Sequence, residues 1–318
     1  QNTNYILTNS NFDMRNDLKY NDIQEISEEI CSREESKVIH CPNLINFNVF
    51  NLSKLFQINN IILKEHYYSY LNIFRSFKKL KRLNYYDKKI LEYYDDLILI
   101  IYMVIKHDKS HFLFFESLLN YYSFKKIINF NIKHLICWWE NQITTKMIFK
   151  SIHDNNKRIN KVAYLGYPTR NLDLRILYSR FDQLNNFLPD TIYFIGDFYK
   201  KKYLNFNTCC NLNLITSKRY SYLKNYKSNT NKYILVSLPI FEDESSKIIN
   251  ILLNIIKFNS HSLSNFIISV HPSLQTNKLK RKLSILKKNT KFIGKNCFKD
   301  FLNSSKLVVG SSSGTIIE

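Results

Sequence analysis

The stretch YILVSL, at Tyr233–Leu238, opens the part of the sequence that decides the fold. It is a short apolar run stopped by a proline, which is typical of a buried strand. Three similar runs follow at Asn265–Val270, Lys291–Ile293 and Leu307–Val309, separated by helical patterns at Asp243–Phe258, Asn277–Lys288 and Phe298–Asn303. Strands that alternate with helices predict a parallel sheet joined by right-handed crossovers. We therefore expect residues 226–318 to form a Rossmann-like domain, although the GxGxxG fingerprint is absent.

The preceding residues, 1–225, are expected to form an α/β domain with a helical insertion. Short apolar stretches that indicate strands occur at Val38-Ile39, Leu44–Phe50, His134–Trp139, Lys161–Gly166 and Thr191–Ile195. Residues 61–130 have helical periodicity. Some of their apolar side chains recur at a spacing of three, a stripe that we expect to face the core: Leu71, Phe74, Phe77, Leu80 and Leu83. The predicted fold class is therefore α/β, with two Rossmann-like domains.

The net charge of +20 is concentrated in the second half of the chain. Residues 198–318 hold 20 Lys or Arg and five Asp or Glu. Such asymmetry favours an anionic partner, which could be a nucleotide, a lipid phosphate, a membrane surface or a nucleic acid. The sequence is also rich in Asn, Lys, Ile, Tyr and Phe, as A/T-rich coding sequences are. Compositional drift is therefore an alternative explanation for part of the charge.

The cysteines and the apolar runs indicate the compartment. The six cysteines form no CxxC pair with metal-ligand spacing, which favours ordinary reduced thiols. The longest uninterrupted apolar run, Leu97–Ile105, has nine residues, whereas a membrane-spanning helix requires roughly 20. We therefore expect a cytoplasmic protein. The chain begins with Gln1 and ends inside a predicted helix, so we also expect a fragment with a truncated C-terminal domain.

Polar groups follow two of the predicted strands, where an open parallel sheet binds its ligands. The first is His271-Pro272, directly after the strand at Asn265–Val270. Imidazole can donate a hydrogen bond to a phosphate oxygen or a sugar hydroxyl, and proline fixes the chain direction. A purely structural histidine is the alternative interpretation.

The second group is a loop of small residues that enters a helix. It consists of Gly310, Ser311, Ser312, Ser313, Gly314 and Thr315. Free backbone N–H groups, hydroxyl donors and the helix dipole all favour an anion there. Glu318, one turn further on, could accept hydrogen bonds from ribose hydroxyls. The loop has no Walker lysine, which argues against a P-loop NTPase, and simple helix capping by the serines is the alternative.

The two motifs in this order resemble those of the GT-B glycosyltransferases of bacterial surface-polysaccharide biosynthesis. The likeness is to capsule and O-antigen biosynthesis proteins related to sialyltransferases and Kdo transferases. The matching segments are Ile268–Pro272, Val309–Thr315 with Glu318, Trp139–Gln142 and Leu188–Asp190, so the resemblance spans roughly residues 135–318. It implies two Rossmann-like domains that face a cleft, with His271, Pro272, residues 311–315 and Glu318 around the CMP part of a sugar donor. At position 167, where this resemblance would place a histidine, the sequence has a tyrosine. A role for that histidine toward the acceptor is therefore not assigned to Tyr167.

Glycosyl transfer with inversion needs a general base for the acceptor hydroxyl. Glu140 is the first candidate because it ends an apolar run, where a sheet would present it to a cleft. Asp173 is the second candidate, since it follows the strand that ends at Gly166. The alternatives are a carboxylate at a helix N-terminus for Glu140 and a surface salt bridge for Asp173. No DxD-like metal pair is recognised near the second site, and the GT-B resemblance implies catalysis without a metal or a separate cofactor.

The sequence therefore predicts a glycosyltransferase that uses a nucleotide-activated sugar, with a CMP-sugar favoured. The acceptor would be a surface-polysaccharide or lipid-linked glycan, and the basic surface could contact the anionic inner leaflet of the membrane. A polyol-phosphate transferase that uses CDP-glycerol is the enzyme alternative. A basic nucleic-acid-binding protein is the less favoured alternative, because the sequence contains no recognised nucleic-acid-binding motif.

Overall fold

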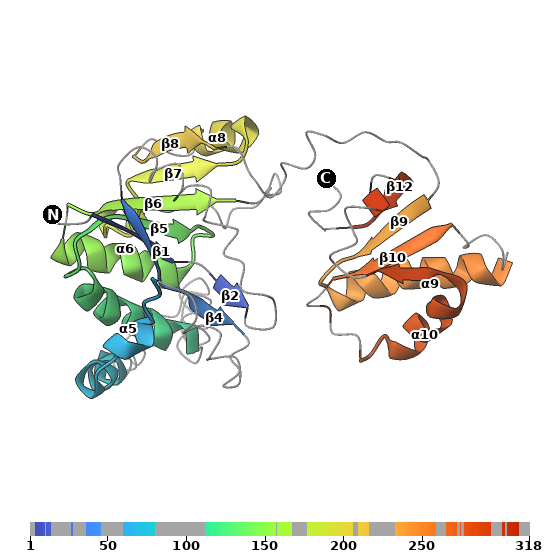
Figure 1. Ribbon diagram of the computed structural model, residues 1–318, viewed down its shortest axis with the longest axis horizontal. Helices are drawn as coiled ribbons and strands as arrows, with labels where there is room; N and C mark the ends of the chain where they lie inside the picture. Colours follow the sequence, from blue (N-terminus) through green and yellow to red (C-terminus); the bar gives the residue numbers. More distant parts are fainter. Residues whose placement is uncertain are drawn as a thin grey trace, which may run out of the picture. The chain divides into compact units, whose positions relative to one another are not determined.

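In the computed structural model, the described residues are 4–9, 11–13, 27, 36–45, 60–79, 112–156, 158–166, 177–205, 209–215, 233–258, 265–271, 274, 277–293, 301–302 and 304–311. The chain divides into two compact units, Gln1–Ser217 and Lys218–Glu318, and each has its own parallel sheet (Figure 1). The expected domain boundary at residue 225 lies outside the described residues. Among the described helices, none combines the length and apolar character needed to span a membrane.

Six strands form the main sheet of the first unit, and every neighbouring pair is parallel. Their order is β3 (Lys37–His40), β1 (Tyr5–Asn9), β5 (Ile132–Trp138), β6 (Asn160–Leu165), β7 (Thr191–Phe194) and β8 (Asn211–Leu214). A separate parallel pair is formed by β2 (Asn11–Asp13) and β4 (Asn43–Ile45). From β1 the chain passes to β3 on one side of β1, and it later returns to form β5 on the other side of β1. The strand order therefore reverses between β1 and β5, which is where open α/β sheets bind ligands.

The helices of the first unit connect and cover this sheet. They are α5 (Phe112–Ile127), α6 (Ile143–Asn155), α7 (Arg180–Leu184) and α8 (Asp197–Leu204), with a 3-10 turn η2 (Lys64–Tyr67) and a helical segment at 70–79. α5 and α6 pack against each other beside the sheet (Figure 1). Fully buried side chains of α6, such as Phe149, share one core with Leu135 of β5 and Ala163 of β6. Because α5 leads into β5 and α6 into β6, the C-terminal ends of both helices lie at the amino edge of the sheet.

The expected apolar stripe in the 70–79 segment does not face the core. Leu71, Phe74 and Phe77 are 55%, 66% and 53% exposed, whereas Asn72 and Ser76 are buried. The prediction was therefore wrong for these three residues, and the other two members of the stripe lie outside the described residues. On a helix of 3.6 residues per turn, side chains at a strict spacing of three are each turned by about 60° around the helix axis from the one before. Five such side chains therefore do not stay on one face of the helix.

The second unit has the fold that the strand and helix alternation predicted. Its four strands are parallel and lie in the order β11 (Lys291–Ile293), β10 (Phe266–Val270), β9 (Tyr233–Leu238) and β12 (Ser305–Val309). Helices α9 (Glu242–Phe258) and α10 (Lys280–Asn289) pack with Val236 and Ile268 in its core. The chain runs outward from β9 to β11 and then returns to the other side of β9. The strand order therefore reverses between β9 and β12.

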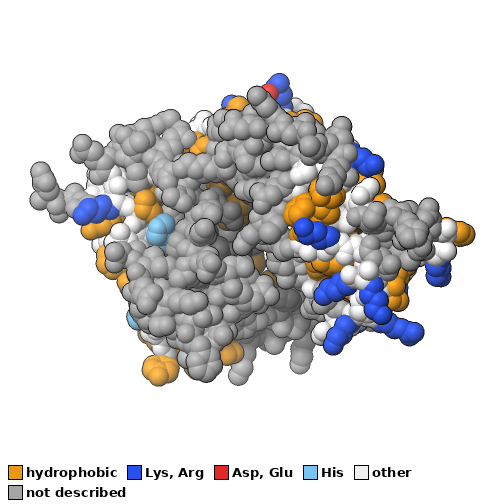
Figure 2. All heavy atoms as spheres, turned by 45° about the vertical axis from the view of Figure 1, so that its right-hand side comes forward, with side chains coloured by type: hydrophobic (Ala, Val, Ile, Leu, Met, Phe, Trp, Pro, Cys, Tyr) orange, Lys and Arg blue, Asp and Glu red, His pale blue; other side chains and the backbone are white. Residues whose placement is uncertain are grey.

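The basic character of the second unit lies on its surface. α10 begins three residues later than expected and carries Lys280, Arg281, Lys282, Lys287 and Lys288. Most of these side chains are exposed, and Figure 2 shows Lys and Arg gathered over this unit. The two helical residues described at 301–302 agree with the helical turn expected at 298–303.

Candidate functional site

The first candidate site is the carboxyl edge of the second sheet. His271 directly follows β10, and Gly310 and Ser311 directly follow β12, with β9 between these two strands. Neighbouring strands lie about 4.8 Å apart, so the two chain exits are separated by about 10 Å along the same edge. The sequence motifs around His271 and Ser311 therefore leave the sheet at the same edge, on either side of the strand-order reversal, at a separation that one nucleotide can span.

The turn after β10 is tied to the end of β9. The His271 N–H donates to the carbonyl oxygen of Leu238 at 3.2 Å, and the His271 carbonyl accepts from the Leu274 N–H at 3.0 Å. The His271 side chain is half-buried. These backbone hydrogen bonds hold the imidazole at the rim of the sheet. Pro272, the second residue of this motif, lies outside the described residues.

The loop after β12 makes a specific contact with the helix that follows β9. Ser311 Oγ donates a hydrogen bond to Glu244 Oε2 at 2.6 Å, and Glu244 lies in the first turn of α9. A hydroxyl that donates to a carboxylate makes a short, charge-assisted bond. This bond crosses the strand-order reversal between β9 and β12. The other proposed residues of the loop, Ser312, Ser313, Gly314 and Thr315, lie outside the described residues, as does Glu318.

Sequence reasoning missed Glu244. By position alone, the acidic residues at 242–244 suit the first turn of a helix, where a carboxylate is favourable, so they do not stand out as site residues. A signal was nevertheless present, because these are the only acidic residues between Asp197 and Asp300 in a strongly basic region. An isolated acidic triplet at a predicted strand exit indicates a position where a carboxylate has a specific partner.

The second candidate site is the carboxyl edge of the first sheet, where Glu140 follows β5 beside the β1–β5 reversal. Both oxygens of its carboxylate accept hydrogen bonds. Trp138 Nε1 donates to Oε1 at 2.8 Å, and Gln142 Nε2 donates to Oε2 at 3.1 Å. The next residue, Asn141, has a positive φ of 57° and donates from Nδ2 to the Leu177 carbonyl at 2.6 Å. Glu140 is therefore half-buried in a fixed turn rather than on a free helix end.

Trp138 is a second residue that the sequence analysis did not single out. Its ring packs edge-on against Tyr164 of β6, with 5.6 Å between ring centroids. Gly166 leaves room for this pair, because a Cβ at position 166 would lie 2.6 Å from Tyr164 Cζ and 2.8 Å from Trp138 Cζ3. The packing orients the indole N–H toward Glu140. The other candidate base, Asp173, lies outside the described residues.

Several buried polar groups lie beside the end of β1 at the same edge. Asn9 Nδ2 donates to the Cys41 carbonyl at 2.8 Å. Burial raises the pKa of the Cys41 thiol to about 12, so this thiol is protonated and is a poor nucleophile at neutral pH. Lys64 is only 2% exposed and pairs with Glu116 at 3.0 Å. These groups support the local structure, and Glu140 is the half-buried carboxylate directly at the exit of β5.

Metal binding has no support in the described part of the chain. No three His, Cys, Asp or Glu side chains gather there in a group that could hold a metal ion. The expected independence from metal ions remains a prediction.

The fold has clear relatives among solved structures. No protein-family model matches the sequence, and a comparison with curated proteins also finds no match. S. aureus MnaA, solved with UDP, has a TM-score of 0.51 at 12% identity, over 98% of this chain and 75% of that chain. A protein from Listeria monocytogenes assigned as a UDP-N-acetylglucosamine 2-epimerase has a TM-score of 0.53 at 9% identity, with the same coverage.

A third structure, TarM, covers 60% of this chain and 39% of its own at 14% identity, and its TM-score of 0.36 is too low to bear on the fold. At such low sequence identities, the first two structural similarities support the fold alone. They confirm the expected α/β, GT-B-like class with two parallel sheets.

Proposed function

We propose that this protein is a GT-B-type enzyme that binds a nucleotide-activated sugar and transfers the sugar to a glycan or lipid-linked acceptor. The observation that carries the proposal is the contact between Ser311 and Glu244 across the β9–β12 reversal, with His271 at the same edge. In an open α/β sheet this is the place where nucleotides bind. The fold shared with MnaA, which was solved with UDP, supports the same class of ligand.

The charges at this edge suggest how the nucleotide is oriented. The Glu244 carboxylate repels phosphate and accepts hydrogen bonds, so ribose hydroxyls are its suitable partners. The imidazole of His271 and the backbone N–H groups at 311–315 are suited to the phosphates. Glu318 offers a second carboxylate for the ribose. The nucleotide would then lie with its sugar beside α9 and its phosphates toward the serine loop.

For the transfer step, we assign Glu140 as the general base, with Asp173 as the second candidate. Glu140 would take the proton of the acceptor hydroxyl while the acceptor oxygen forms a bond to the anomeric carbon. The bond between that carbon and the phosphate oxygen breaks, and the leaving nucleotide keeps the electron pair. His271 and the loop donors would stabilise the charge that develops on the phosphate. The sequence resemblance favours a CMP-sugar as the donor. We place the enzyme in the cytoplasm, in contact with the inner leaflet of the membrane.

A second candidate function is epimerisation of a UDP-sugar. It is favoured by the two similar structures, because one was solved with UDP and the other is assigned as a UDP-N-acetylglucosamine 2-epimerase. The two functions differ in one measurable way. Transfer needs an acceptor and releases the nucleotide, whereas epimerisation of the intact donor changes the sugar without an acceptor.

Nucleotide binding can be tested by thermal shift on the full chain with CMP, CDP, UDP, GDP and ADP. A ligand at 100 times its Kd should stabilise the protein by about 2.7 kcal/mol. The shift should be lost in His271→Ala and Ser311→Ala. It should persist in Ser284→Ala, a matched control whose exposed hydroxyl donates to the Arg281 carbonyl of its own helix. Unchanged melting with all five nucleotides would contradict the proposal.

The reaction itself can be tested by NMR with CMP-, UDP- and CDP-activated donors, with and without glycan acceptors. We expect transfer that falls by about 100-fold or more in Glu140→Gln, because a general base contributes that much, while the nucleotide-induced thermal shift is retained. Conversion of a UDP-sugar without an acceptor would favour the epimerase instead. Transfer from CDP-glycerol alone would favour the polyol-phosphate transferase.

A further inference from the structure

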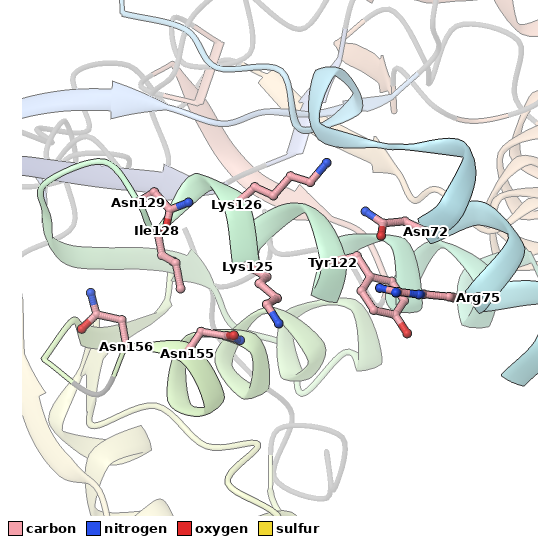
Figure 3. Close-up of a pocket in the computed structure, with 9 residues that line it drawn as sticks. All are labelled: Asn72, Arg75, Tyr122, Lys125, Lys126, Ile128, Asn129, Asn155 and Asn156. Carbon is pink, nitrogen blue, oxygen red and sulfur yellow. The ribbon is translucent and has the colours of Figure 1, made fainter.

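A pocket of about 420 Å³ lies in the first unit, and Figure 3 shows the residues that line it. Its walls come from the helical segment at 70–79, from the C-terminal end of α5 with the turn that follows, and from the C-terminal end of α6 with its own turn. These helix ends lead into β5 and β6 at the amino edge of the sheet. Glu140 is at the opposite, carboxyl edge, so the pocket is separate from the proposed catalytic centre.

The pocket is positively charged. Arg75, Lys125 and Lys126 line it, and none of the lining residues is acidic. Within the part of the chain that the structure describes, none of the three is paired with a carboxylate. Lys126 Nζ donates instead to a neutral acceptor, the backbone carbonyl of Tyr67, at 3.2 Å. The positive charge of the pocket is therefore not neutralised by the described side chains around it.

Two opposing electrostatic effects act in this pocket and can be compared. The C-terminal ends of α5 and α6 each place about half an elementary negative charge at the pocket, which disfavours an anion. Arg75, Lys125 and Lys126 supply three full positive charges. The nearest acidic side chain of α6, Asp154, already accepts a hydrogen bond from Tyr121 Oη at 3.0 Å and pairs with Lys150 at 2.9 Å. Among the described groups the positive charges prevail, so this lining favours an anion.

The rest of the lining suits hydroxyl groups. Four asparagines contribute to it, and a carboxamide can both donate and accept hydrogen bonds as a sugar hydroxyl does. Asn72 is only 6% exposed, and its side-chain amide lies in the wall of the pocket (Figure 3). Asn155 uses Nδ2 to donate to the Ser151 carbonyl at 2.8 Å, which leaves its Oδ1 as an acceptor. Tyr122 adds an aromatic ring against which the apolar side of a sugar can pack.

We propose that this pocket is a second binding site, for an anionic carbohydrate of about monosaccharide size whose charge is carried by a phosphate or a carboxylate. The cations would bind the oxyanion and the asparagines the hydroxyls. The volume falls within the range of about 300–1,000 Å³ that is usual for small-molecule sites. This proposal does not depend on the proposed glycosyl transfer.

Isothermal titration calorimetry on the full chain can test the site with four probes. They are glucose 1-phosphate, glucuronate, inorganic phosphate and glucose. We expect one or both acidic sugars to bind more tightly than inorganic phosphate and glucose, because only they offer the oxyanion and the hydroxyls together. Whichever acidic sugar binds identifies the oxyanion. Binding that is no tighter than that of glucose would overturn the proposal.

Variants distinguish this pocket from the nucleotide edge, which could also bind a sugar phosphate. The double variant Arg75→Gln/Lys125→Gln removes two exposed cations, so the fold should be preserved. It should weaken binding at least about tenfold, which corresponds to about 1.4 kcal/mol. Lys78→Gln is the matched control, since Lys78 is an exposed cation of the same helical segment that does not line the pocket. Equal affinity in the double variant and the wild type would refute the assignment.

Discussion

Replacement of Gly166 by alanine tests the packing that orients Trp138 toward Glu140. A Cβ at position 166 would lie 2.6 Å from Tyr164 Cζ and 2.8 Å from Trp138 Cζ3, closer than real Cβ contacts. Tyr164 is only 2% exposed, so its ring cannot move into solvent. Either the tyrosine or the indole must shift. Because the Trp138 Nε1–Glu140 hydrogen bond is 2.8 Å long, even a small shift of the indole would disturb it.

The size of the effect follows from two opposing terms. Alanine reduces the conformational freedom of the unfolded chain, which stabilises the fold by about 0.4–1 kcal/mol. Overpacking a buried aromatic pair destabilises it by about 1–3 kcal/mol. The middle of these two ranges gives a net destabilisation of about 1–2 kcal/mol. For a unit of the size of Gln1–Ser217 this lowers Tm by about 2–8 °C.

Urea unfolding followed by tryptophan fluorescence is the appropriate assay. Both tryptophans of the chain, Trp138 and Trp139, lie at the end of β5, so their fluorescence reports the first unit. Gly196→Ala is the matched control, because a Cβ there would meet its nearest atom, Tyr199 Cδ2, at an acceptable 3.4 Å. If Gly166→Ala were as stable as Gly196→Ala, the inferred packing of Trp138 against Tyr164 would be incorrect.

Two further predictions concern ion pairs of the first unit. Burial by itself would raise the pKa of Asp182. The hydrogen bond and charge of Lys146, 2.8 Å away, together with hydrogen bonds from the Ser179 backbone and hydroxyl, outweigh it and lower the pKa. This stabilisation is complete above the ordinary aspartate pKa of about 3.9 and is lost as the pH falls through the folded pKa. Urea midpoints below about pH 4 should therefore fall more steeply for the wild type than for Asp182→Asn, and parallel curves would contradict this reasoning. Glu116→Gln would remove the carboxylate that lies 3.0 Å from the buried Lys64 ammonium, so the free energy of unfolding should fall by about 3 kcal/mol in urea titrations. The exposed Glu65→Gln should have little effect, and an equal loss in the two variants would show that the Lys64–Glu116 pair is not the cause.

Much of the second unit could be predicted from the sequence. The strand at Tyr233–Leu238 was predicted with the correct bounds. For β12 the predicted strand began two residues too late and ended at the correct residue. Buried parallel strands are short runs of β-branched residues, and amphipathic helices repeat every 3.6 residues, so both are visible in a local window. The 70–79 segment shows the limit of this reasoning, because its buried face is the one that carries Asn72 and Ser76.

The candidate site was predictable only in part. His271, Ser311 and Glu140 were selected because they follow predicted strands, and the structure places each at the carboxyl edge of a sheet. The partners of these residues could not be selected in the same way. Glu244 is 67 positions before Ser311, and the indole that orients Glu140 is itself held by a ring from the neighbouring strand. Strand β1, second from the edge of the first sheet, was also missed, although its apolar run at Tyr5–Leu7 is of the kind that indicates a strand.

By itself the sequence determined the class of the fold, the strand exits that carry polar groups and the basic second half. Tertiary structure alone decided the strand order, and with it the two reversals beside which Glu140 and Ser311 lie. It also decided the Glu244 contact and the pocket formed by the ends of α5 and α6. The reason is physical: secondary-structure periodicity arises from neighbours in the chain, whereas strand pairing and side-chain contacts join residues that only the packed core brings together.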